Sequence, residues 1–154
     1  DEERLVCRER RAWTLRCLPD ANVLDASFTL LATDEPLTLG DTKEGTFALR
    51  LHPRLRVEGP VAAGTLENSE RQRDGEVWGR RARWVQASGE VQGQPVGVLL
   101  LDHPSNPRHP TWWHARTYGL LAANPFGPHD FEGAPPGTGD LTLAPAKSSR
   151  CATE

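Results

Sequence analysis

Short alternations of apolar and polar residues, separated by glycine and proline, run through most of the chain. The clearest alternation spans Leu24–Ala32, where every second side chain is apolar, and Phe47–Leu51 repeats the pattern. Ala82–Ser88 leads into another apolar segment, Pro95–Leu101, and Gln92-Gly93 lies near the turn between them. A period of two is typical of strands with one buried face, and such a turn favours a hairpin. These segments predict antiparallel β-structure.

Weaker strand patterns and long loops complete this picture. The weaker candidates are Trp13–Leu18, Tyr118–Ala122 and Leu141–Leu143, and the stretches without a strand pattern are residues 59–79, 102–112 and 126–139. The 14 Gly and 13 Pro fall between the short segments, as they do in β-sandwiches and barrels. We expect an all-β antiparallel sandwich in a single domain, residues 1–154, with roughly five or more strands and no helix longer than about three turns.

Composition and charge narrow the class of protein. With 37% hydrophobic and 25% charged residues, the chain has the balance of a soluble globular protein, and no apolar run approaches the roughly 18 residues that span a membrane. A net charge of -3 argues against nucleic-acid binding. The arginines nevertheless cluster, and we interpret the clusters as charged strand faces, with a basic pocket as the alternative: Arg8, Arg10, Arg11, Arg80, Arg81 and Arg83.

Cysteine usage and the ends of the chain leave the compartment open. Cys7, Cys17 and Cys151 are an odd number without a CxxC spacing, which disfavours a disulfide framework and a structural zinc site. A Cys7–Cys17 bridge stays open for an exported protein. The first residues, DEERLVCRERR, contain neither an initiator Met nor a signal peptide, so we expect the chain to begin inside a longer gene product. Cytoplasmic and periplasmic locations both remain open.

The segment from Asp102 to Phe126 concentrates the residues that can carry chemistry. It follows an apolar strand and holds three of the five histidines, and prolines stiffen its first part. The residues that we single out here are Asp102, His103, Asn106, Arg108, His109, Trp112, Trp113 and His114. A functional site, if the chain has one, is predicted in this segment.

Three interpretations of these histidines compete. His103, His109 and His114 are able to ligate a divalent metal with Asp102 or Glu44, although their spacing matches no standard zinc motif. One histidine and one carboxylate are also able to act as an acid–base pair, with His109, His114, Asp102 and Glu44 as catalytic candidates. The third interpretation is a loop held together by histidine and asparagine side chains that bond to the backbone. The sequence identifies no cofactor, and we assign none of the candidate site residues as a metal ligand.

Aromatic and charged neighbours suggest a sugar as the ligand. Indole faces pack against sugar rings, and adjacent Trp112 and Trp113 point to opposite sides of a strand, so one of them is expected to face a groove or a partner. Trp84 is expected in the core. The segment GDTKEG, Gly40–Gly45, suits a tight turn that presents Lys43 and Glu44. The predicted substrate-binding residues are His103, Asn106, Arg108, Trp112, Trp113 and Lys43.

Three motifs resemble a known bacterial family. GDTKEGTFALRL, VWGRRARWV and LLDHPSNPRHPTWWHARTYGLLAANPFG resemble the C-terminal half of a domain of unknown function labelled methane oxygenase PmoA-like, from about Trp13 to Ala144. The resemblance implies a soluble β-sandwich, associated with carbohydrate metabolism and similar to half of a mutarotase-like supersandwich. The N-terminal half of that domain has no counterpart here, and the tail of residues 145–154 has almost nothing to bury. These departures suggest a truncated or frameshifted product.

Two functions from different classes follow from these observations. The leading hypothesis is a β-sandwich that binds or acts on a sugar or sugar derivative through the Asp102–Phe126 segment. The alternative is a non-catalytic interaction or structural module, or a family member without activity, that associates with itself or with a missing N-terminal half. A histidine and a carboxylate within about 3 Å of each other favour the first, and a flat apolar patch favours the second.

Overall fold

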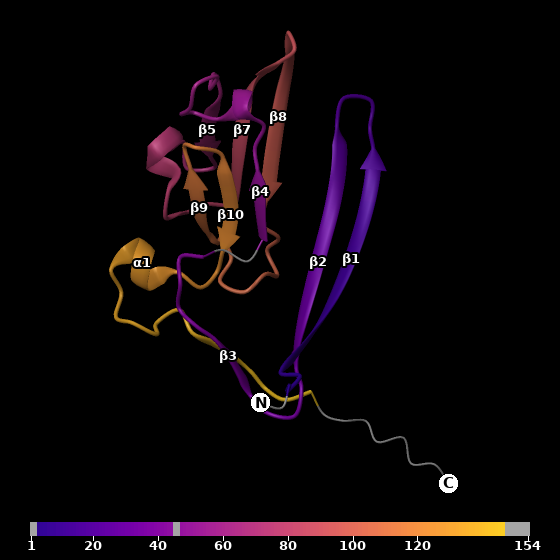
Figure 1. Cartoon of the computed structure of the whole chain (residues 1–154), viewed down its shortest axis with the longest axis vertical. Helices are drawn as coiled ribbons and strands as arrows, with labels where there is room; N and C mark the ends of the chain where they lie inside the picture. The colour runs from indigo at the N-terminus through magenta and orange to yellow at the C-terminus, as the bar shows by residue number, and fades with distance from the viewer. Residues whose placement is uncertain (1–2, 45–46, 147–154) are drawn as a thin grey trace. The chain divides into compact units, whose positions relative to one another are not determined.

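The computed structural model describes residues 3–44 and 47–146, which fall into two compact units. The first unit contains the described residues up to Leu39 and from Leu141 onward, and the second contains those between Gly40 and Asp140. Each unit is built almost entirely from antiparallel strands (Figure 1). The division comes at Gly40 and Asp140, and the prediction of a single domain stays a prediction.

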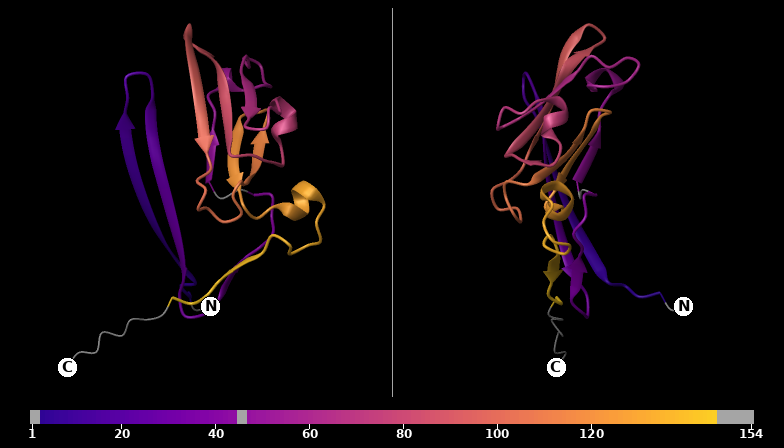
Figure 2. Two further views of the ribbon diagram at one scale, coloured as in Figure 1. Left: turned by 180° about the vertical axis from the view of Figure 1, so that it is seen from behind. Right: turned by 90° about the vertical axis from the view of Figure 1, so that its left-hand side faces the viewer.

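The first unit consists of a long hairpin and a short strand pair. Strands β1 (Cys7–Cys17) and β2 (Asn22–Ala32) pair along their whole length, as the views in Figure 2 also show. The register places Trp13 opposite Ala26 and Leu15 opposite Leu24, so apolar side chains of both strands meet on one face of the hairpin. Strands β3 (Leu37–Leu39) and β11 (Leu141–Leu143) form the second pair.

The second unit contains two antiparallel sheets that share one core. The first sheet has the order β4-β10-β9-β6, and the second has the order β5-β7-β8. In the first sheet the strands are β4 (Phe47–Arg50), β6 (Arg80–Arg81), β9 (Trp112–Arg116) and β10 (Leu120–Asn124), and in the second they are β5 (Thr65–Asn68), β7 (Trp84–Val91) and β8 (Gln94–Leu101). Both sheets contribute side chains to one apolar cluster: Leu66, Val85, Ala87 and Leu100 come from the second sheet, and Trp113, Ala115 and Leu121 from the first.

Three short helical turns interrupt the strands of the second unit. The 3-10 turns are η1 (Pro53–Leu55) and η2 (Asp74–Val77), and the α-helical turn is α1 (Pro128–Glu132). No helix in residues 3–44 and 47–146 is long and apolar enough to cross a membrane. The all-β antiparallel fold and the expectation of short helices are therefore confirmed.

The predicted hairpin between β7 and β8 is confirmed, and its turn has the expected chemistry. Gln92 and Gly93 both adopt a positive φ, of 54° and 77° respectively. Two successive positive φ values match the twist of the flanking strands, and glycine reaches this region without strain.

The two described cysteines lie far apart. Cys7 and Cys17 are free and occupy opposite ends of β1, which has 11 residues. At about 3.3 Å per residue, their separation greatly exceeds the reach of a disulfide. The Cys7–Cys17 bridge that the sequence left open is therefore not formed. Cys151 and most of the tail lie outside the described residues.

Candidate functional site

Asp102 is the centre of a hydrogen-bonded cluster in the loop between β8 and β9. Its amide donates to the carbonyl of Arg83 at 2.9 Å, which fixes the residue where β8 leaves the core. Its side chain is only 3% exposed. Oδ2 accepts from His109 Nδ1 at 2.7 Å and from the Thr111 amide at 2.9 Å, and Oδ1 accepts from Asn106 Nδ2 at 2.8 Å. The buried carboxylate therefore organises the whole loop.

The bond to Asp102 determines the orientation and the tautomer of His109. An ionised carboxylate only accepts hydrogen bonds, so Nδ1 of the neutral imidazole carries the proton and Nε2 keeps its lone pair. The His109 side chain is 19% exposed, in contrast to the 3% of Asp102. This combination of a buried orienting carboxylate and a partly exposed imidazole suits proton transfer at Nε2.

Two further polar residues of the loop are exposed. His103 Nδ1 lies 2.7 Å from Ser105 Oγ and accepts from the Ser105 amide at 3.2 Å. Asn106 directs its Nδ2 to Asp102, and its backbone carbonyl accepts from the His109 amide at 3.2 Å. Both side chains therefore present hydrogen-bonding groups at the rim of the Asp102 cluster.

Arg108 anchors the loop from within. Its backbone adopts a φ of 60°, which is uncommon for a side chain of this size. Its guanidinium donates to the carbonyl groups of Pro125 at 2.7 Å, Gly139 at 2.6 Å and Asp140 at 2.8 Å. Its own carbonyl accepts from Arg81 Nη2 at 3.0 Å. Arg108 was predicted to bind substrate, and in the structure its donors serve these three carbonyls.

The side chains of β9 divide between the core and the outer face of the sheet. Trp113 and Ala115 belong to the apolar core cluster, and the Trp113 indole donates to the Ala82 carbonyl at 2.9 Å. Trp112, His114 and Arg116 alternate with them and therefore lie on the opposite face. Trp113 was predicted to bind substrate, but it is 1% exposed and packs inside the protein.

Trp112 is covered on the outer face. Its indole donates to Glu132 Oε1 of α1 at 2.7 Å, and the Arg81 guanidinium lies 4.5 Å from the centre of its ring. The side chain is 5% exposed. Neither of the adjacent tryptophans therefore presents an open face, so a sugar ring stacks on Trp112 only if Arg81 moves away.

His114 forms the centre of a second cluster on the same face. Its Nδ1 lies 2.7 Å from the Lys43 carbonyl, and a carbonyl only accepts, so Nδ1 carries the proton. Its Nε2 accepts from Arg116 Nε at 2.9 Å. Burial lowers the pKa of His114, and the neighbouring charges of Arg116 and Lys43 lower the pKa further, whereas the Lys43 carbonyl and Glu44 oppose this effect. His114 is therefore held neutral between two partners.

The GDTKE segment is tied to the rest of the second unit. Asp41 accepts from the amides of His129 and Gly139, at 3.3 and 2.8 Å. The carbonyl of Thr42 accepts from Asn124 Nδ2 at 2.8 Å, and the amide of Lys43 donates to Asp130 at 2.8 Å. The segment therefore joins α1 to the sheet, which a simple surface turn does not do. Gly45 lies outside the described residues.

The predicted residues thus fall into separate groups. Asp102, Asn106 and His109 form one hydrogen-bonded cluster, and Lys43 and His114 form another. Glu44 is exposed and acts on His114 through its charge. Within the part of the chain that the structure describes, no group of three or more His, Cys, Asp or Glu side chains is arranged to hold a metal ion.

Several residues near His114 were not identified from the sequence. Arg116 donates to His114, the Phe131 ring lies 6.2 Å from the His114 ring, and Trp78 packs against Phe131 at 5.4 Å. Arg116 stands two residues after His114, so recognition of a strand here would have put both on one face. Trp78 and Phe131 come from distant segments, and no local pattern connects them with β9.

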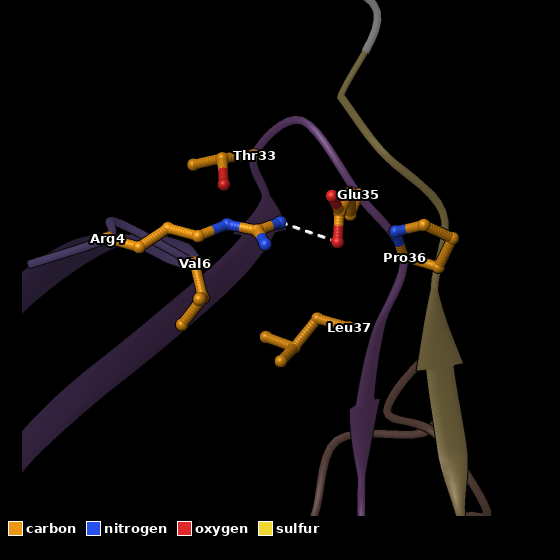
Figure 3. Close-up of a pocket in the computed structure, with 6 residues that line it drawn as sticks. All are labelled: Arg4, Val6, Thr33, Glu35, Pro36 and Leu37. Atoms are coloured by element: carbon orange, nitrogen blue, oxygen red, sulfur yellow. Dashed lines mark ion pairs between the residues drawn. The ribbon is translucent and has the colours of Figure 1, made fainter. Parts of the chain in front are cut away.

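A cavity of about 140 Å³ lies in the first unit (Figure 3). It is lined by residues that precede β1 and residues that follow β2. An exposed ion pair between Arg4 and Glu35 crosses it at 2.5 Å. The remaining lining residues are Val6, Thr33, Pro36 and Leu37. None of the predicted site residues lines this cavity.

Comparisons with known proteins identify one family. The family described as "Family of unknown function (DUF6807)" matches residues 1–152. No curated protein and no solved structure matches the chain.

Proposed function

The chain belongs to this family of unknown function, DUF6807, and we propose that residues 102–111 form an acid–base site for a hydroxyl-rich small molecule, a sugar or sugar derivative. The observation that carries this proposal is the 2.7 Å hydrogen bond between His109 Nδ1 and Asp102 Oδ2. It supplies the histidine–carboxylate contact expected of a catalytic pair. The resemblance to a bacterial family associated with carbohydrate metabolism supports the choice of a sugar.

His109 acts through its second ring nitrogen. Nε2 accepts the proton of a sugar hydroxyl, and the imidazolium that forms still donates from Nδ1 to the buried Asp102 carboxylate. The carboxylate stabilises the positive charge and keeps the ring from rotating. The proton then returns from Nε2 to an oxygen of the sugar. A histidine in this role contributes about 10²–10⁴-fold to the rate of proton transfer.

Exposed polar groups around His109 provide contacts for the substrate hydroxyls. The Asn106 side chain donates to Asp102 through Nδ2, and its Oδ1 makes no hydrogen bond with the described residues. The His103 ring and the Ser105 hydroxyl lie at the loop surface. Amide, imidazole and hydroxyl groups each accept or donate hydrogen bonds, which suits a ligand with several hydroxyls.

The proposal is tested by following proton-transfer reactions of sugars by NMR. Aldoses, lactones and uronates are incubated with the protein in D₂O, and exchange between anomers and deuterium incorporation are measured. We expect acceleration of one substrate class, reduced about 100-fold or more by His109→Gln and strongly by Asp102→Asn. His52→Gln is the control, because His52 is exposed and caps η1. Equal rates for the wild type and His109→Gln contradict the proposal.

The hairpin of the first unit favours a second candidate role, association with another chain. Leu15 and Leu24 are paired on its apolar face and are 64% and 56% exposed. A two-stranded hairpin is marginally stable in water without further packing, so association through this face stabilises it. Sedimentation velocity at micromolar concentrations is expected to detect self-association or binding to a partner. A monomer at every concentration, with no partner bound, argues against this role.

A further inference from the structure

The indole nitrogen of Trp78 is a buried donor without an acceptor among the described residues. Trp78 follows the 3-10 turn η2, and the next residue, Gly79, donates from its amide to the Trp113 carbonyl at 2.9 Å. The backbone of Trp78 is therefore fixed beside β9. Nε1 is inaccessible to solvent and makes no hydrogen bond with the residues that the structure describes. A buried N–H without a partner is unfavourable, so a bound acceptor atom at this point is stabilising.

Arg116 presents further donors next to this indole. Its guanidinium carbon lies 5.1 Å from the centre of the Trp78 ring. Nε donates to His114, which holds the plane of the guanidinium in place, while Nη1 and Nη2 make no hydrogen bond or ion pair with the described residues. A guanidinium fork that is fixed through Nε and open at Nη matches the two oxygens of a carboxylate.

Lys43 adds a second positive charge beside Arg116, and nearby carboxylates reduce the net positive charge of these surroundings. The Lys43 carbonyl accepts from His114 Nδ1 at 2.7 Å and Arg116 Nε donates to His114 Nε2 at 2.9 Å, so both residues lie beside this histidine. Three carboxylates belong to the same surroundings: Glu44 also acts on His114, Asp130 accepts from the Lys43 amide, and Glu132 accepts from Trp112. With this balance of charge, a singly charged anion is accommodated more favourably than a doubly charged one.

We propose that Arg116, Lys43 and the Trp78 indole N–H form a binding site for the carboxylate group of a small organic acid. The Arg116 fork binds the two carboxylate oxygens and moves away from the Trp78 ring as it does so. The indole N–H, which solvent does not reach in the free protein, then donates to one of these oxygens or to a neighbouring hydroxyl. Arg116 and Trp78 are within reach of one small molecule, because the guanidinium lies over the indole. This site does not depend on the acid–base proposal for His109.

The test uses the indole N–H resonance of Trp78 in ¹H–¹⁵N spectra of the full chain. The resonance is identified as the one lost in Trp78→Phe. Acetate, D-glucuronate, D-glucose and inorganic phosphate are titrated separately. We expect saturable shifts with both carboxylates at millimolar concentrations, no shift with glucose, and a weaker effect of phosphate. Glucose and glucuronate differ at the carboxylate carbon alone, so they are a matched pair.

Variants then assign the shift to the proposed donors. Arg116→Lys keeps a donor for His114 but loses the planar fork, and we expect glucuronate affinity to fall about tenfold or more. Arg50→Lys is the matched control, because Arg50 lies 5.5 Å over the Tyr118 ring on the same sheet, and its affinity should equal that of the wild type. Lys43→Ala should weaken binding several-fold.

Several results overturn the proposal. These are the absence of any shift of the Trp78 resonance with either carboxylate, an equal shift with glucose, or tighter binding of phosphate than of glucuronate. Unchanged glucuronate affinity in folded Arg116→Lys has the same consequence. If Arg116→Lys does not fold, as judged by its thermal melt, the wild-type titrations and Lys43→Ala still decide the outcome.

Discussion

Removal of the Asp102 carboxylate is the most severe test of how hydrogen bonds stabilise the loop between β8 and β9. Asp102→Ala deletes the acceptor of three hydrogen bonds, from His109, Thr111 and Asn106. His109 and Asn106 reach water after the change, but Thr111 is 2% exposed, so its amide stays buried without a partner. A hydrogen bond to a charged group contributes about 1.5–3 kcal/mol and a buried donor without a partner costs about 1–3 kcal/mol, so we expect the free energy of unfolding to fall by about 3–5 kcal/mol.

A conservative variant separates the hydrogen bonds from the charge. Asp102→Asn keeps one oxygen that accepts from His109 and Thr111, and the Asn106 amide can turn to accept from the new NH₂ group. We therefore expect a smaller loss for this variant, of about 1–2 kcal/mol. Glu90→Ala removes an exposed carboxylate from β7 of the same unit and should stay within about 0.5 kcal/mol of the wild type.

The assay is urea unfolding followed by tryptophan fluorescence, with the slope against urea compared between variants. The expected order of stability is wild type and Glu90→Ala together, then Asp102→Asn, then Asp102→Ala. An Asp102→Ala variant within about 0.5 kcal/mol of the wild type refutes the central role of the carboxylate in the loop.

Three further predictions concern the surroundings of this loop. Arg108→Lys replaces a fork that serves three carbonyls by a single ammonium and should lower the free energy of unfolding by about 2–3 kcal/mol, so an unchanged urea midpoint contradicts the anchoring role. Gly139→Ala places a Cβ 2.0 Å from the Phe126 carbonyl and should cost more than about 3 kcal/mol, whereas Gly75→Ala meets nothing within 4 Å and should melt within a few degrees of the wild type. Because burial lowers the pKa of His114 below its usual value of about 6.5, the unfolded chain takes up a proton first. Stability from this group is therefore complete above about pH 6.5 and falls as the pH decreases, by at most about 1.4 kcal/mol per pH unit, and His114→Gln should flatten the dependence in urea unfolding at a series of pH values. Identical slopes in the two proteins contradict this explanation.

The sequence predicted the parts of the fold that have a one-sided hydrophobic pattern. β2, β4 and the β7–β8 hairpin were recognised because polar and apolar residues alternate along them or because the turn contains Gly93. β9 was not recognised as a strand, because Trp112, Trp113, His114 and Ala115 are all buried and no alternation is visible. A strand that is covered on both faces loses the period-two pattern. The first half of β1 was not among the predicted strands, although its arginines were interpreted as a charged strand face, because no apolar residue alternates with the charged ones there.

The candidate site was predicted in part. The Asp102–Phe126 segment was identified from its concentration of histidines, and the contact between Asp102 and His109 depends on a loop whose course no periodicity predicts. The division of the histidines between two clusters was not foreseen, because it depends on the side of β9 to which each residue points. Trp78, Phe131 and Glu132 reach β9 from distant segments, so their contribution becomes visible only in three dimensions.

The most direct test of the acid–base proposal is a histidine side-chain ¹⁵N spectrum recorded while a sugar is titrated against the protein. We predict that His109 carries its proton on Nδ1 in the free protein, and that Nε2 is the ring nitrogen whose resonance shifts as the sugar binds. His52 should keep its resonances throughout, since it lies outside the proposed site. A sugar that binds saturably without changing the Nε2 resonance, or a His109 ring with its proton on Nε2, contradicts the proposed role of the Asp102–His109 pair.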